Sequence, residues 1–598
     1  GKHTLKYGVD FRHVLYYTPE YLPLTTLGGA GGGSDDFGFF NFGGNFSGNA
    51  FADFLLGLPT FTYQTMSGPD AQGTQNQWAF YAQDEWRVTS KLTLNFGLRY
   101  AILPPFIEKG KNQAVFDPAT GGLIVPDGAP TNPNLLASIN TCGTGPHGGG
   151  LDPDLKCVPL LTASQAGLGQ GLRHTYYGDY QPRVSFAFRP FGNDKTVIRG
   201  GFGIYTVINL GQFSVNSSND NIAIVRIYTN ANPVTGAPTF QFPNALVQAP
   251  PQAFIGSTNI DMNVPTNFRD PQSNQWNLTL ERELPLGMAL RASYLGMNTY
   301  RMQVTEDLNQ VQPSTHPYNP ALKPYPNWGI IYSSENAGFA NYQAMQVELD
   351  KRLKNGLTLQ ASYMLEKNLS DYQGDAPSGF PPEILYGETV DDRFSLRNER
   401  GNVEADPRQR FLLSGTYELP IGTGKRFFAN AGRAVEAILG GWQVSTIALI
   451  ESGPFLTPTY DVSLVDPANL NAFNRGAVGR PDRIGSGSVS NPTPNHYFNI
   501  NAFTAPPINA GRIGNSGVGV LTGPGTIAIS GGLAKNFSLS ERFKLRLEAT
   551  VNNLPNHPNF APPATDVAIP ATFGTTSSVQ TAENAANRTG QLALRLTF

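Results

Sequence analysis

The chain has 598 residues and a formal net charge of −3, and only 15% of its residues are charged. Aromatic residues make up 11% of it, which argues against intrinsic disorder, because disordered chains are poor in aromatic residues and rich in net charge. The basic residues form no cluster and the pI is 6.2, so nothing in the composition favours binding to nucleic acid.

The sequence argues against a helical membrane protein. A spanning helix needs roughly 18 consecutive apolar residues, and the best candidate, residues 434–440, is too short and contains Glu436. The other spanning solution is a closed β-barrel, whose strands need only about 9 to 11 residues and alternate apolar with polar side chains. The mean hydropathy of −0.25 is compatible with such strands. Residues 1–7 read as a strand without an apolar signal core, so we expect the secretion signal to lie upstream, in a longer protein.

Segments in which every second residue is apolar recur along the chain, as expected of strands with one apolar face. In chain order the clearest are residues 92–100, 357–363, 543–552 and 591–598. In the last segment, Leu592, Leu594, Leu596 and Phe598 alternate with Gln591, Ala593, Arg595 and Thr597. A soluble β-sandwich would give the same alternation, so the pattern alone leaves both folds open.

The lengths of the connections favour the barrel. Short links are expected at residues 88–91, 190–195, 284–287, 353–356 and 538–542. Long stretches rich in Gly, Pro and Asn lie between them, at residues 104–177, 209–270, 299–340, 368–407, 452–523 and 554–587. Alternation of short and long links is typical of an outer-membrane barrel, with tight periplasmic turns on one rim and long extracellular loops on the other.

Two segments are less regular. We interpret residues 37–63 as a descending strand, a short helical turn at 50–56 and a rising strand, and residues 419–441 as a long periplasmic connection with some helical character. With these choices the chain holds about sixteen strands and begins and ends at the periplasmic rim. The predicted fold class is all-β, a transmembrane antiparallel β-barrel.

The chain resembles the barrel of Oar-like TonB-dependent outer-membrane receptors. The resemblance covers nearly all strands and is carried by the order and spacing of several short motifs. They are residues 1–8 (GKHTLKYG), 49–57 (NAFADFLLG), 81–87 (YAQDEWR), 95–100 (NFGLRY), 406–411 (DPRQRF) and 552–560 (NNLPNHPNF). The terminal strand, with Leu594, Leu596 and Phe598, looks like the signal that barrel-insertion machinery recognises.

The resemblance implies a barrel of 22 strands, preceded by a plug domain that contacts TonB and by a further β-sandwich domain. About six strands and both domains would then lie before Gly1, and residues 1–598 would be an N-terminally truncated barrel. A complete passive porin of sixteen strands remains an alternative, in which the first strand would close against the last.

Few residues indicate a chemical site. Cys142 and Cys157 share one long loop, and a loop disulfide is the favoured reading in an oxidising compartment; a metal site with His147 lacks ligands. Carboxylates gather in another loop, at Asp371, Asp375, Glu383, Glu388, Asp391 and Asp392. We take Asp371, Asp375, Asp391 and Asp392 as candidates for ligand binding; a solvated loop is the alternative, because the spacing of an EF-hand is absent. We predict no catalytic residue, no cofactor and no metal.

Aromatic residues at expected strand ends are candidates for the girdles at the two membrane interfaces. They are Trp78, Tyr100, Trp276, Tyr294, Tyr363, Tyr417 and Trp442. The leading functional hypothesis is energised uptake of a large or scarce ligand across the outer membrane of a Gram-negative bacterium, with a TonB-type partner in the inner membrane. A passive porin, and a barrel for protein export or adhesion, are the alternatives, and the sequence leaves the ligand unknown.

Overall fold

The computed structural model describes most of the chain, with gaps in several long connections. The described residues are 1–18, 39–66, 71–111, 113–129, 159–193, 195–207, 224–230, 235–243, 260–326, 328, 330–354, 356–371, 388–404, 406–430, 432–460, 479–507, 510–538, 540, 542–581 and 585–598. Among them, no helix combines the length and the apolar character needed to cross a bilayer.

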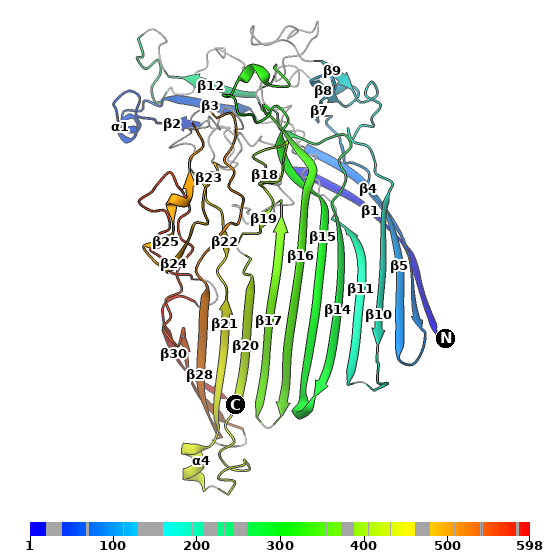
Figure 1. Cartoon of the computed structure of the whole chain (residues 1–598), viewed down its shortest axis with the longest axis vertical. Coiled ribbons are helices and arrows are strands. Elements are labelled where there is room, and N and C mark those ends of the chain that lie inside the picture. Colours follow the sequence, from blue (N-terminus) through cyan, green and yellow to red (C-terminus); the bar gives the residue numbers. More distant parts are fainter. Residues whose placement is uncertain are drawn as a thin grey trace.

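One large, curved sheet dominates the described structure (Figure 1). Of its 18 strands, β6, β13, β18 and β19 are short, which leaves fourteen long strands among the described residues. These are β1 (His3–Thr18), β4 (Ala71–Arg87), β5 (Leu92–Ile102), β10 (Asp179–Phe188), β11 (Thr196–Thr206), β14 (Gln272–Leu284), β15 (Met288–Asp307), β16 (Ile331–Lys354), β17 (Leu357–Ser370), β20 (Gln409–Glu418), β21 (Trp442–Glu451), β28 (Thr526–Ser538), β29 (Lys544–Asn552) and β30 (Thr589–Thr597). Each long strand pairs antiparallel with the next long strand along the chain. The antiparallel barrel-type sheet predicted from the sequence is therefore confirmed.

The two rims of the sheet carry different connections. Short turns join β4 to β5, β10 to β11, β14 to β15, β16 to β17 and β28 to β29 at the lower rim of Figure 1. The sixth link on this rim joins β20 to β21 and holds the helix α4 (Arg433–Leu439), as expected for residues 419–441. All seven long connections leave from the upper rim, and the two chain ends lie toward the lower rim. The predicted alternation of short and long links is thus confirmed.

Strand register keeps apolar side chains on one face of the sheet. Since side chains alternate along a strand, residues directly opposite each other share a face. One such row crosses seven strands, through Leu280, Ala292, Val347, Tyr363, Phe411, Ile450 and Ile527. The adjacent row on the other face begins with Glu281, Arg291, Glu348 and Ser362. The first face therefore suits lipid and the second suits a polar lumen.

A lysine with lipid-facing parity lies near the lower rim. The ammonium group of Lys535 contacts the carbonyl oxygen of Gly440 and lies 3.3 Å from that of Glu436, both at the C-terminal end of α4. Helix C-termini favour cations because their carbonyl groups lack partners in the helix. The helix thus allows Lys535 to direct its charge out of the apolar layer.

The prediction that residues 37–63 supply two strands of the barrel is wrong. The local elements of this segment are present, as β2 (Phe39–Asn41), α1 (Ala50–Leu55) and β3 (Phe61–Met66). However, β3 pairs with β2 and with β12 (Ile224–Thr229) in a separate small sheet above the upper rim. The reason is that β1 and β4 pair directly over the full length of β1, which leaves no place for other strands between them. The sixteen expected strands become fourteen long ones in the described sheet.

Candidate functional site

The described residues of the long connections pack together above the sheet, and we call these residues the roof. Three connections, residues 103–178, 207–271 and 308–330, share an apolar core with Phe116, Val125, Ile260, Trp328 and the first residue of β16, Ile331. Small strands support it: β7 (Val115–Asp117), β8 (Gly122–Val125) and β9 (Leu160–Thr162). A second core joins residues 452–525 to 553–588. The roof therefore packs around apolar cores, as a domain does.

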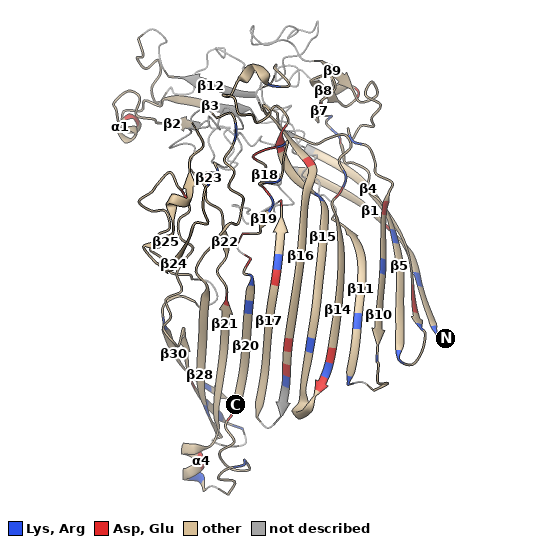
Figure 2. Cartoon of the chain, viewed as in Figure 1, with Lys and Arg blue, Asp and Glu red and all other residues tan. Residues whose placement is uncertain are grey.

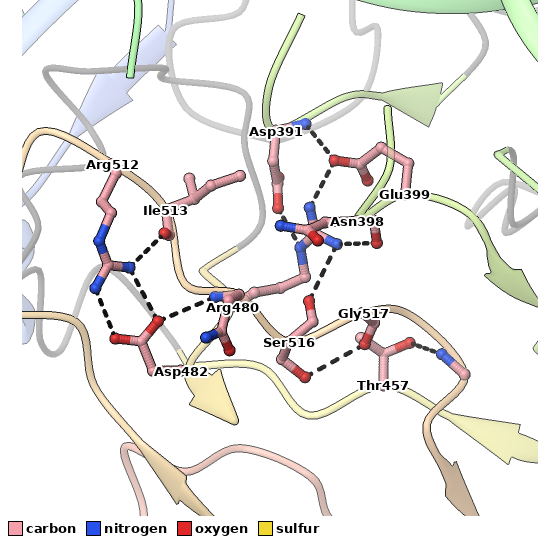
Figure 3. A network of polar contacts seen from close by, with 12 residues as sticks. Asp391, Asn398, Glu399, Thr457, Arg480, Asp482, Arg512, Ile513, Ser516 and Gly517 are labelled. Atoms are coloured by element: carbon pink, nitrogen blue, oxygen red, sulfur yellow. Dashed lines mark hydrogen bonds and ion pairs between the residues drawn. The ribbon is translucent and has the colours of Figure 1, made fainter. Parts of the chain in front are cut away.

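A buried arginine ties two roof connections together (Figure 3). Arg480 is 2% exposed, and its guanidinium forms ion pairs with Asp391 and, at 2.6 Å, with Glu399. It also donates to the backbone carbonyl of Asn398 at 2.6 Å. Burial alone would lower the pKa of Arg480, but the two carboxylates outweigh it and raise the pKa. A buried guanidinium is stable when carboxylate and carbonyl oxygens accept its hydrogen bonds. Arg480 has such partners, and it thereby holds residues 388–404 against residues 479–520.

Residues 390–399 are also hydrogen-bonded to the connection at residues 308–330. The side-chain amide of Gln310 donates to the carbonyl oxygen of Asp391 at 2.7 Å, and its own oxygen accepts from the backbone N–H of Arg393 at 3.0 Å. The guanidinium of Arg393 donates to the carbonyl oxygen of Leu308 at 2.6 Å. Three connections are thus linked through residues 390–399.

A second ion pair lies beside Arg480. Arg512 contacts Asp482 through two parallel N–H···O bonds, each 2.9 Å long (Figure 3). Burial would raise the pKa of Asp482, but Arg512 and the backbone N–H of Asn515 lower it below its usual value. Such bidentate pairs fix geometry as well as charge.

An acidic side chain is buried where β15 enters the roof. Glu306 is 8% exposed and lies 3.6 Å from the guanidinium of Arg393. Burial and the nearby charges of Glu335 and Asp392 raise its pKa to about 7, although Arg393 opposes the shift. Glu306 can therefore change charge near neutral pH.

Three of the four carboxylates predicted to bind a ligand lie among the described residues. Asp391 is engaged by Arg480 in the roof interior. Asp371 lies 3.3 Å from Arg400 and accepts from the N–H of Phe339 at 3.0 Å. Asp392 accepts from the N–H of Phe394 at 2.9 Å, and Asp375 lies outside the described residues. The described part of the chain holds no group of three or more potential metal ligands. Ligand binding by these carboxylates stays a prediction.

The lumen-facing side of the sheet carries a row of alternating charges. Arg199 and Arg291 each lie 3.4 Å from Glu281, and Arg291 lies 2.6 Å from Glu348. These residues belong to β11, β14, β15 and β16, and Figure 2 shows the charged segments low on the sheet. Together with Asn277 and Gln346 they form a polar wall, as expected of an aqueous lumen.

The predicted girdle residues fall at different heights on the strands. Trp78, Tyr100 and Trp276 lie eight or nine residues above the lower ends of β4, β5 and β14, which corresponds to roughly 25 to 30 Å along the strand. Tyr417 and Trp442 lie at the lower ends of β20 and β21. These two levels suit the two membrane interfaces. Tyr294 and Tyr363, six residues above the lower ends, lie between them.

The predicted disulfide and the predicted insertion signal are not tested by the structure. Cys142, Cys157 and His147 lie outside the described residues, so the disulfide stays a prediction. At the C-terminus, Leu594, Leu596 and Phe598 are 67%, 51% and 84% exposed and share the apolar face, opposite Leu547 and Leu545. Their role as an insertion signal also stays a prediction.

Sequence reasoning missed the residues that organise the roof. Arg480 and Arg393 lie in connections and not in alternating strands, and the ion-pair partners Asp391 and Glu306 lie more than 80 positions away along the chain. The charge row could have been found, because Arg291 and Glu348 occupy polar positions of alternating segments.

An antiparallel sheet with an apolar outer face, a polar inner face and rims of unequal loop length defines the class of outer-membrane β-barrels. The chain belongs to the outer membrane beta barrel domain family, whose sequence profile matches residues 1–591. This places the protein in the outer membrane. No curated protein matches the chain.

Several solved structures are similar at low identity. The siderophore receptor PiuA from Acinetobacter baumannii is 10% identical with a TM-score of 0.35, over 90% of this chain and 44% of that chain. The FrpB iron transporter from Neisseria meningitidis, in its apoprotein form, is 10% identical with a TM-score of 0.39, over 100% of this chain and 54% of that chain. The ferripyoverdine receptor of Pseudomonas aeruginosa is 9% identical with a TM-score of 0.38, over 90% and 44%. The chain thus spans about half the length of these proteins.

Proposed function

We propose that the chain forms the barrel of a receptor for energised, TonB-dependent uptake of a large or scarce ligand. The observation that carries the proposal is the roof, a folded body held by the buried Arg480 pairs and two apolar cores above a polar wall. Capture of a ligand benefits from a surface that is already ordered, because less conformational entropy is lost on binding. We assign the chain no catalytic role.

We further propose that additional strands complete the barrel and that a plug and a TonB-contacting segment belong to the same protein. In the described sheet, β1 pairs only with β4, and β30 pairs only with β29. An open sheet edge in lipid is costly because its backbone N–H and C=O groups have no partners there. The Oar-like assignment within the receptors belongs to the same proposal.

Uptake measurements with and without an inner-membrane proton gradient test the function. Cells with and without the gene would be grown on single iron chelates, glycans or peptides as the only source of a nutrient, and a protonophore would then be added during short uptake assays. We expect gene-dependent uptake that stops when the gradient collapses. Gene-dependent uptake that continues at the same rate would contradict TonB dependence and support a passive pore. Surface binding without uptake would contradict transport and support adhesion.

Point substitutions in the roof are better suited to these assays than deletion of a whole connection. Deletion of residues 368–407 would remove Asp391 and Glu399 together, and Arg480 would remain buried without a counter-ion. Loss of uptake would then report collapse of the roof as readily as loss of a binding surface.

A further inference from the structure

Two arginines approach the same tyrosine ring at the base of the roof. The guanidinium carbons of Arg269 and Arg301 lie 4.5 and 5.7 Å from the centre of the Tyr176 ring. The three residues come from three separate parts of the chain, namely the connection before β10, the connection before β14, and β15 itself. Each contact is a favourable cation–π interaction, but two like charges at this separation repel each other.

The backbone holds the two arginines in place. The side-chain amide of Asn336 donates to the carbonyl oxygens of Arg269 and Arg301, at 2.8 and 3.1 Å, and its oxygen accepts from the N–H of Arg269 at 2.7 Å. Arg301 has a φ of 60° at a bulge between Tyr300 and Met302. This conformation is unfavourable for a side chain other than Gly, and bulges of this kind redirect side chains. The hydrogen bonds of Asn336 and the bulge therefore hold the backbones of Arg269 and Arg301 in a defined arrangement.

Neither guanidinium has an ion-pair partner among the residues that the structure describes. Arg301 donates to the side-chain oxygen of Gln272, a neutral group. Asp270, the carboxylate next in sequence to Arg269, interacts with Arg173. Asp179 accepts from the Gln272 amide at 3.1 Å and reaches Arg301 only through that amide. Among the described residues, the site thus holds two positive charges, neither of which has an ion-pair partner.

The cluster lies above the lipid-facing belt. Gln272 has the same parity along β14 as Trp276, Leu278 and Leu280, so Arg301 reaches the outer face of the sheet. Gln272 lies four residues beyond Trp276, which is roughly 13 Å further along the strand. If Trp276 marks the membrane interface, the arginines lie at the level of the lipid headgroups of the outer leaflet.

We propose that Arg269 and Arg301 bind a phosphate group of an outer-leaflet lipid, with the Tyr176 ring supporting both guanidinium groups. The planar fork of arginine matches phosphate oxygens in pairs, and a phosphate between the two would neutralise their repulsion. Free phosphate has the same chemistry, but the outer-face position favours a lipid. The site is separate from the lumen and does not depend on the proposed uptake.

Lipid retention by the purified full chain tests the site. The protein would be mixed in detergent with lipid A, a glycolipid that carries two phosphate groups, and in parallel with dephosphorylated lipid A or inorganic phosphate. Retained lipid would be counted by native mass spectrometry. We expect the chain to retain lipid A, and R269Q/R301Q to retain it with an affinity lower by about tenfold or more. Dephosphorylated lipid A should bind the chain and the variant equally weakly.

The matched control is R426Q/R483Q, which removes the same charge from exposed arginines on the lower rim and in the roof. It should retain lipid A like the unmodified chain. R269K/R301K keeps the charge without the fork, and intermediate retention is expected. Heat-dependent migration in gels would confirm that each variant is folded. Equal retention by R269Q/R301Q and the control would overturn the proposal, as would binding of inorganic phosphate by a chain that does not retain lipid A.

Discussion

The guanidinium of Arg480 lies 2.6 Å from the carboxylate of Glu399, and both side chains are almost fully buried, at 2% and 5% exposed. The two residues belong to different connections, 81 positions apart. Asp391 forms the second ion pair of the same guanidinium. Arg480 therefore supplies two buried ion pairs to the contact between these two parts of the roof.

Substitution of Arg480 is expected to loosen the roof while leaving the sheet intact. R480M would leave Asp391 and Glu399 buried without a counter-ion, and the loss of one partner from a buried ion pair costs about 3–5 kcal/mol. Hydrogen exchange should speed up in residues 390–404 and 479–507, while β14 to β17 keep their protection. R483M, at the exposed arginine three positions later, is the control. Unchanged exchange in R480M would show that the ion pairs contribute little to the roof.

The buried carboxyl of Glu306 gives the roof a defined pH dependence. Its pKa of about 7 lies above the ordinary value of 4.5, so the folded roof binds this proton more tightly than the unfolded chain does. Roof stability should therefore rise as the pH falls from about 7 toward 4.5, and should be lowest above pH 7. E306Q would remove the part of this dependence that Glu306 contributes, while burial also raises the pKa of Asp307 and Glu335, and would stabilise the roof above pH 7 by up to about 3 kcal/mol.

Hydrogen exchange of residues 304–311, corrected for its intrinsic pH dependence, would measure this effect at about pH 5.5 and about pH 8. Asp482 provides a contrast of opposite sign. Arg512 and Asn515 hold the pKa of Asp482 below its usual value, so its contribution to stability is present above the ordinary pKa and is lost as the pH falls through the folded value. D482N should therefore destabilise the roof at neutral pH. Equal protection of residues 304–311 at both pH values would argue against a raised pKa for Glu306.

Local sequence patterns predicted the sheet well because its faces follow a period of two. Leu594 and Leu547 were each assigned to an apolar face from their own strands, and the register then placed them opposite each other. The segment at residues 37–63 shows the limit of this approach. Its strands were found locally, but their partner β12 lies more than 150 residues away, and no periodic signal connects the two.

The roof could not be derived in this way. The contacts of Arg480 depend on which long connections meet in space, and alternation carries no information about that. The quoted motifs illustrate the same point. Asn559, within residues 552–560, is 1% exposed and exchanges hydrogen bonds with the backbone of Ile527. The motif was recognised by resemblance, while its role in holding the top of β28 became visible only in the structure.

The two faces of β14 should respond differently to an added charge. Leu280 lies on the apolar face and is 44% exposed, whereas Asn277 lies on the lumen face of the same strand. A lipid-facing arginine near the middle of a bilayer costs about 2–4 kcal/mol, while lumen positions tolerate charge. L280R should therefore lower the free energy of unfolding in lipid vesicles, measured by denaturant titration, and N277R should change it little. Equal effects of the two substitutions would contradict the assignment of the faces.

Disulfide cross-linking between β1 and β30 should distinguish a barrel closed by these two strands from a larger one. Leu5 and Leu596 both lie near the lower rim on the apolar face, as do Tyr7 and Leu594. In a passive porin whose first and last strands pair, cysteines at one of these two pairs would be close enough for a disulfide, which needs Cα atoms within about 7 Å. In the larger barrel that we propose, other strands lie between β1 and β30, and neither L5C/L596C nor Y7C/L594C should cross-link.

A L547C/L594C pair, on adjacent strands, is the positive control for reactivity. The native cysteines would be replaced by serine in all variants, and the experiment would use the protein in its native membrane. Efficient cross-linking between β1 and β30 would contradict the larger barrel, because backbone groups that pair with each other have no capacity for further strands.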